Sequence, residues 1–184
     1  MAAPMIPMGV LLLCLLAACV TDWRHRKIPN RLVLVGIAAA LLCSALIDGT
    51  IGFAQAALGG LVGLGIFLPL YAIRWVGAGD AKLMAMVGLF LGPAGAAWSA
   101  LYAFVAGGIL AIVMLLMFGG WASAREKIQL LFISLVFRIR GAPIPMPVES
   151  GEKALRLPYA LAIAAGTLAW IALSGGLAFT NMAS

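Results

Sequence analysis

The stretch Gly92-Pro93-Ala94-Gly95 interrupts an apolar run that extends from residue 83 to residue 118. An α-helix rises about 1.5 Å per residue, so one unbroken helix over this run would be far longer than a bilayer core of roughly 30 Å. Proline and glycine together favour a turn. We therefore predict two membrane spans here, at about residues 80–93 and 96–120.

The composition is that of a polytopic membrane protein. Of the 184 residues, 65% are hydrophobic and 10% are charged, and the mean hydropathy is +1.14, outside the range of soluble globular domains. Other apolar runs predict further spans at about residues 4–21, 32–47, 51–73 and 157–180. We expect one membrane-embedded domain over residues 1–184, an all-α bundle of six transmembrane helices.

The distribution of basic residues predicts the orientation of these spans. The segments after the first, third and fifth spans carry four, two and six Lys/Arg, which together make all twelve in the chain. Because basic loops tend to stay in the cytoplasm, we expect both termini outside and the segment 121–156 in the cytoplasm. A single span over residues 83–118 would split the charges six and six, which disfavours it. The net charge of +6 therefore reflects topology, and nucleic acid is not an expected partner.

Two of the three aspartates fall at the cytoplasmic edge of predicted spans. Asp22 follows the first span, Asp80 begins the fourth within Gly77-Ala78-Gly79-Asp80-Ala81-Lys82, and Asp48 falls on the opposite face. A charged side chain at membrane depth is costly and is usually retained for a function. Two carboxylates are the minimum for aspartyl proteolysis, in which the anion takes a proton from attacking water and the protonated partner donates to the peptide carbonyl.

The ends of the predicted helices also separate the roles of the two aspartates. The helix dipole favours an anion at Asp80, at a helix N-terminus, and disfavours one at Asp22, after a helix C-terminus. We therefore expect Asp80 to be the base and Asp22 the acid in the resting state.

Several neighbours are candidate supporting or substrate-binding residues. Gly77 and Gly79 would let a substrate backbone approach closely. Lys82 would tune the proton affinity of the pair or face lipid phosphates, and Pro29 and Asn30 form a turn into the second span. The simpler alternatives are that Asp80 is only a helix N-cap, that Asp22 is the solvated start of a loop, and that Tyr159 is an interfacial aromatic.

The three cysteines indicate packing in the bundle and no cofactor. Cys14, Cys19 and Cys43 lie inside apolar runs, and no Cys-x-x-Cys pair is present. Such residues are more often small packing residues than zinc ligands. We expect neither a metal nor another cofactor.

Three stretches together resemble the type IV prepilin peptidases. They are residues 21–30, which run from Thr21-Asp22 to Ile28-Pro29-Asn30, residues 77–83 around Asp80, and Leu157-Pro158-Tyr159-Ala160-Leu161-Ala162 at the start of the last span. With the span count and loop placement, the likeness covers nearly the whole chain. It is greatest to the short branch that serves tight-adherence, Flp-type pili.

This resemblance implies an aspartyl endopeptidase of the bacterial inner membrane with Asp22 and Asp80 as its catalytic pair. Its substrate would be a prepilin or pseudopilin, cut after a glycine on the cytoplasmic side of the pilin's hydrophobic helix. Glu126, Glu149 and Glu152 are candidates for binding the basic leader of that substrate.

The chain departs from the larger members of this family at its beginning. Those members carry an additional N-terminal cytoplasmic region with paired Cys-x-x-Cys motifs, associated with methylation of the mature pilin. Here the first span begins within a few residues of Met1. We therefore expect proteolysis without zinc.

Two other functions remain open. A small ion- or proton-coupled transporter would place acidic residues near the bilayer midplane, often with repeats or broken helices. A non-catalytic component of a secretion assembly would tolerate Asp→Asn at both positions. Beyond lipid and a pilin-like substrate, the sequence indicates no partner and no oligomeric state.

Overall fold

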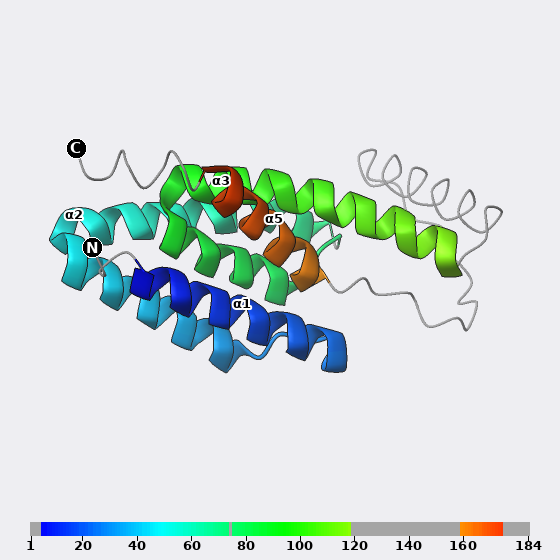
Figure 1. Ribbon diagram of the computed structural model, residues 1–184, viewed down its shortest axis with the longest axis horizontal. Coiled ribbons are helices and arrows are strands. Elements are labelled where there is room, and N and C mark those ends of the chain that lie inside the picture. The colour runs from blue at the N-terminus through cyan, green and yellow to red at the C-terminus, as the bar shows by residue number, and fades with distance from the viewer. Residues whose placement is uncertain (1–4, 74, 119–158, 175–184) are drawn as a thin grey trace. The chain divides into compact units, whose positions relative to one another are not determined.

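The computed structural model describes residues 5–73, 75–118 and 159–174, and every element in these ranges is an α-helix. The helices are α1 (Met5–His25), α2 (Asn30–Ala72), α3 (Ala78–Phe118) and α5 (Tyr159–Ser174) (Figure 1). The predicted all-α fold is confirmed for these residues. The predicted cytoplasmic segment 121–156, with its three glutamates, lies outside the described residues.

Within the described ranges, four helical stretches are long and apolar enough to cross a membrane. They are Ile6–His25, Asn30–Ile47, Gly49–Ala72 and Ala78–Met114, each with a mean hydropathy of 1.9 to 2.0. The apolar helix α5 is shorter, at 16 residues. The chain is thus a helical membrane protein, while six crossings and outward-facing termini stay predictions.

The helix α2 reverses direction at Gly49. This glycine has φ 64° and ψ −143°, in a left-handed region that glycine adopts without steric cost. A Cβ built on Gly36 would overlap the Met86 side chain, and one on Gly63 would lie 2.5 Å from the Met84 carbonyl oxygen. In one straight helix residues 36 and 63 would lie about 40 Å apart. Both halves of α2 therefore pack on the same part of α3, and the chain reverses between the predicted spans 32–47 and 51–73.

The helix α3 is likewise broken, at Gly92, which has φ 72° and ψ −179° and precedes Pro93. A Cβ built on Gly88 would lie 3.2 Å from the Cβ of Ala96. Eight residues along a straight α-helix advance about 12 Å, so this contact requires the chain to turn back. The interruption predicted at this site is confirmed.

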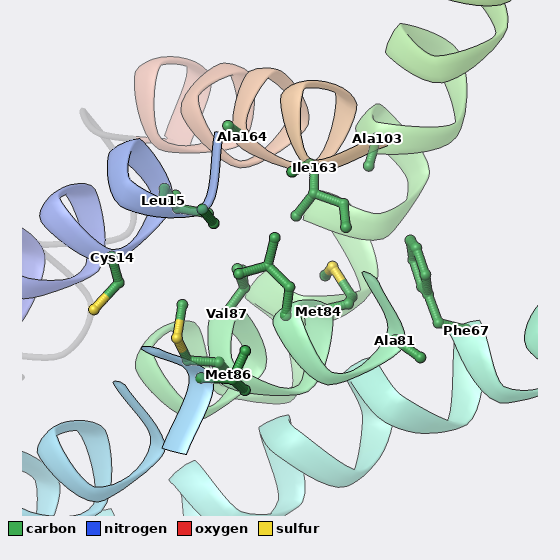
Figure 2. Close-up of a cluster of buried hydrophobic side chains, with 14 of the residues drawn as sticks. Cys14, Leu15, Phe67, Ala81, Met84, Met86, Val87, Ala103, Ile163 and Ala164 are labelled. Atoms are coloured by element: carbon green, nitrogen blue, oxygen red, sulfur yellow. The ribbon is translucent and has the colours of Figure 1, made fainter. Parts of the chain in front are cut away.

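The chain forms two compact units, one of residues 1–107 with 158–184 and one of residues 108–157. In the second unit the described part is the end of α3. The core of the first unit is apolar and contains side chains from all four helices, among them Leu15, Phe67, Met84 and Ile163 (Figure 2). The expectation of a single domain stays a prediction.

Candidate active site

Asp22 lies in the last turn of α1. The first helix was expected to end near residue 21, with Asp22 at the start of a loop, but α1 continues to His25. Arg26 ends it with φ 51°, and the Arg26 N–H donates to the Asp22 carbonyl at 2.8 Å. A left-handed residue with this hydrogen bond is a common helix C-cap. The loop interpretation of Asp22 is therefore wrong, because this cap extends the helix by one turn.

The Asp22 side chain is buried against the start of α5. Its exposed fraction is 8%, and its Oδ2 accepts a hydrogen bond from the Ala160 N–H at 3.2 Å. The first N–H groups of a helix have no partner within the helix, and the Asp22 carboxyl group is the partner of the Ala160 N–H. The carbonyl oxygen of Ala160 also has a partner in α1, because it accepts a hydrogen bond from the Cys19 thiol at 3.6 Å. The end of α1 is thus joined to the start of α5 by two polar contacts.

Asp80 is the third residue of α3. Its Oδ2 accepts a hydrogen bond from the Gly77 N–H at 3.0 Å. In return the Gly77 carbonyl accepts from the N–H groups of Asp80 and Ala81, at 3.1 and 3.3 Å. This is one half of a capping box, with Gly77 at the N-cap. The expectation of Asp80 at a helix N-terminus is confirmed, but the N-cap residue itself is Gly77.

The two carboxylates gather at one end of the first unit. Asp80 lies within electrostatic reach of Asp22 and of the Tyr159 hydroxyl. Asp22 in turn has Cys19 of its own helix and Arg26, which follows that helix, nearby. Residues distant in sequence thus form a cluster of ionisable groups at the start of α3 and of α5.

The positions of the two carboxyl groups remove the expected difference in helix dipole between Asp22 and Asp80. Asp22 was assigned as the acid because it follows a helix C-terminus, yet its carboxylate also faces the N-terminus of α5. Asp80 faces the N-terminus of α3. Because Asp80 accepts from Gly77 at the N-cap of α3 and Asp22 accepts from Ala160 in the first turn of α5, both lie at helix N-termini, and the dipole argument no longer separates acid from base.

Two of the predicted supporting residues contact each other. The Lys82 ammonium donates to the Asn30 side-chain oxygen at 3.1 Å, which joins the start of α3 to the start of α2. Pro29, with φ −63° and ψ 129°, occupies the N-cap of α2, and its carbonyl accepts from Leu32 and Val33. The predicted turn at Pro29 is confirmed. The polar partner of Lys82 is an amide rather than either carboxylate.

Gly79 has little free space beside it. A Cβ built on Gly79 would lie 3.2 Å from the Cβ of Ile28. The loop between α1 and α2 therefore packs directly on the first turn of α3. This glycine permits a close contact within the protein, and its role toward a substrate stays a prediction.

The profile of the type IV leader peptidase family matches residues 9–112. The chain belongs to this family. The expected resemblance is thereby confirmed, and the matched range contains both Asp22 and Asp80. No curated protein and no solved structure matches the chain.

In this member of the leader peptidase family, the contribution of α5 to the candidate active site was not predicted from the sequence. Tyr159 was interpreted as an interfacial aromatic, but its half-buried ring stands edge-on to Phe67 at 6.0 Å. A Cβ built on Gly107 would lie 2.9 Å from the same ring. The hydrogen bond from Ala160 had no signal at all, because a backbone N–H is present at every residue except proline.

The thiols and carboxylates of the described ranges form no cluster of three or more metal-binding side chains. Cys14, Cys19 and Cys43 are free thiols, and Cys14 is buried. The acid–base groups that the described helices bring together at this end are the carboxyl groups of Asp22 and Asp80 and the hydroxyl of Tyr159.

Proposed function

We propose that the protein is an aspartyl endopeptidase that removes the leader peptide from Flp-type prepilins, with Asp22 and Asp80 as its catalytic pair. The observation that carries this proposal is that Asp22, in the last turn of α1, and Asp80, in the first turn of α3, lie at neighbouring helix ends. The loop that follows α1 packs through Ile28 on Gly79, and the charge of Asp22 acts on the Asp80 carboxyl group. The membership of the chain in the leader peptidase family supports the reaction class.

The proposed reaction is hydrolysis of one peptide bond. One carboxylate, as the anion, removes a proton from a water molecule, whose oxygen attacks the peptide carbonyl. The other carboxyl group donates its proton to the carbonyl oxygen, which gives a tetrahedral diol. The C–N bond then breaks: the first carboxyl group passes the proton from water to the leaving amine nitrogen, and a diol hydroxyl returns a proton to the second carboxylate as the new carboxyl group forms. Two carboxyl groups that act together in this way would share a proton and titrate as a pair. The Gly77 and Ala160 N–H groups hold one carboxylate each.

The proposed cleavage takes place at the cytoplasmic face of the bacterial inner membrane. The short segment after Asp22 carries Arg24, Arg26 and Lys27, and such basic segments favour the cytoplasmic side. With six crossings, Asp80 lies on that side too. A prepilin whose hydrophobic helix lies in the same membrane presents its leader at this level.

The test is cleavage of a co-expressed Flp-type prepilin, read as a gel shift. We expect the parent protein to cleave and both Asp22→Asn and Asp80→Asn to lose cleavage, because an amide supplies neither acid nor base. Asp48→Asn is the matched control and should cleave like the parent. All four proteins must accumulate equally in the membrane.

The same assay separates the other functions. Cleavage by Asp80→Asn would refute the aspartyl peptidase and leave the transporter as the leading candidate. A secretion-assembly component would leave the prepilin uncut in every strain, while both Asn variants still supported assembly.

A further inference from the structure

We propose that the first turn of α5 is a positioning element of the active site, in which the Ala160 N–H holds the Asp22 carboxylate in place opposite Asp80. This inference rests on the proposed function. It assigns a role to a part of the chain that lies beyond the range matched by the family, which ends at residue 112.

The position of α5 is fixed by close contacts along its length. At its start, the Tyr159 ring packs on Phe67. In its middle, a Cβ on Gly166 would lie 2.6 Å from the Cα of Ala103. Further on, the Trp170 ring stacks on Trp98 at 5.8 Å, with the planes 8° apart. A helix held at three levels has little freedom to slide, so its N-terminal donors have fixed positions.

The contact with Asp22 is suited to positioning. Asp22 is 8% exposed, and a buried carboxyl group requires hydrogen bonds because water no longer solvates it. The Ala160 N–H supplies one at 3.2 Å. A backbone donor cannot rotate away as a side chain can. The Cys19 thiol contacts the Ala160 carbonyl oxygen, so both backbone polar groups of Ala160 contact side chains of α1.

This donor acts on one member of the pair. Hydrogen bonds from an N–H favour the charged form of a carboxyl group. Among the described residues, the other ionisable groups that interact with Asp22 are Cys19 of α1, Arg26 just after α1 and Asp80 of α3, and Tyr159 of α5 interacts with Asp80. The Ala160 N–H therefore orients the Asp22 carboxyl group beside a neighbouring carboxyl group.

The contact can be measured without any substrate. Each of the three tyrosines precedes an alanine, at Ala72, Ala103 and Ala160. Labelling tyrosine with ¹³C at the carbonyl and alanine with ¹⁵N selects these three amides in an NMR spectrum of the detergent-solubilised protein. We expect the Ala160 amide proton to move with pH in the parent and to stop moving in Asp22→Asn, with Ala72 and Ala103 as internal controls. An Ala160 signal that behaves like the two controls would overturn the inference.

To test whether the contact between Ala160 and Asp22 affects catalysis, the Ala160 N–H must be removed without changing its side chain. Cell-free translation with lactic acid in place of Ala160 replaces the amide by an ester and leaves the side chain unchanged. The matched control is the corresponding ester at Leu161, whose N–H is also in the first turn. We expect the ester at residue 160 to lower kcat about tenfold or more, because hydrogen bonds to charged groups are strong. KM should stay within about twofold and the acidic limb of the pH profile should move to higher pH.

Equal activity of the two esters, or an ester at residue 160 that cleaves like the parent, would overturn the positioning role. A parent protein that does not cleave a prepilin would instead refute the proposed function and the catalytic role with it. In that case the NMR titration still shows whether the contact between Ala160 and Asp22 exists, so the two failures are distinguishable.

Discussion

The sharpest prediction about the packing concerns two glycines on one helix, Gly63 and Gly65. A Cβ built on Gly63 would lie 2.5 Å from the Met84 carbonyl oxygen and 3.4 Å from the Cα of Ala85. These are backbone atoms and cannot rotate away. A Cβ built on Gly65 has nothing within 4 Å. The substitutions Gly63→Ala and Gly65→Ala therefore make the same chemical change in opposite surroundings.

The cost follows from the distance. Ordinary contact begins at 3.4 Å, so α2 and α3 must separate by about 0.9 Å to accept an alanine in place of Gly63, which is the difference between 3.4 and 2.5 Å. Overpacking of this kind costs about 1–3 kcal/mol. Gly65→Ala should be neutral or stabilising by up to about 1 kcal/mol, because alanine favours a helix over glycine. Met84 lies one turn beyond Asp80, so the same separation displaces the Asp80 carboxylate, which we propose to be catalytic.

The assay is thermal unfolding of both purified variants in the same detergent, together with prepilin cleavage. We expect Gly63→Ala to unfold at least about 3 °C below Gly65→Ala and to cleave more slowly, while Gly65→Ala cleaves like the parent. Equal unfolding temperatures and equal activities would refute the proposed packing of α2 on α3.

Other substitutions test the elements around the pair. Lys82→Met should lower stability by about 0.5–1.5 kcal/mol through loss of its bond to Asn30; Asn30→Ala should do the same, with no additive loss in the double variant. Gly79→Ala should slow cleavage because its Cβ presses on Ile28, and Ile28→Ala in the same chain should restore the rate. Tyr159→Ala should destabilise the protein by roughly 2 kcal/mol, measured by thermal unfolding, whereas Tyr159→Phe keeps the ring packing and should cost less. Cleavage should continue in the presence of EDTA, since two carboxyl groups and water suffice for the reaction.

Much of the helical layout could be predicted because its signals are local. The breaks at Gly49 and Gly92 depend on the conformational freedom of glycine and on the neighbouring Pro93, which are visible in the sequence. The start of α2 could be predicted for the same reason, because it depends on Pro29, which is visible in the sequence. The placement of Asp22 and Asp80 at one end was predicted by counting six spans, and that number of spans stays a prediction.

The features that were missed depend on tertiary contacts. The end of α1 is set by Arg26 in a left-handed conformation, which is uncommon for a residue other than glycine. The partner of Asp22 is a backbone N–H from α5, a helix that begins more than a hundred residues later. The bond between Lys82 and Asn30 joins two residues that were each named as supporting, but their pairing had no signal in the sequence.

The most direct test of the central claim is a thiol crosslink between positions 22 and 80. Asp22→Cys and Asp80→Cys are introduced together after the three native cysteines are replaced by alanine. The membranes are treated with a short bifunctional thiol reagent, and crosslinked peptides are identified by mass spectrometry. Asp48→Cys with Asp80→Cys is the control, because the first half of α2 carries residue 48 about 27 Å from Asn30. We predict a crosslink for positions 22 and 80 and none for 48 and 80. Full labelling without a crosslink between positions 22 and 80 would contradict the account.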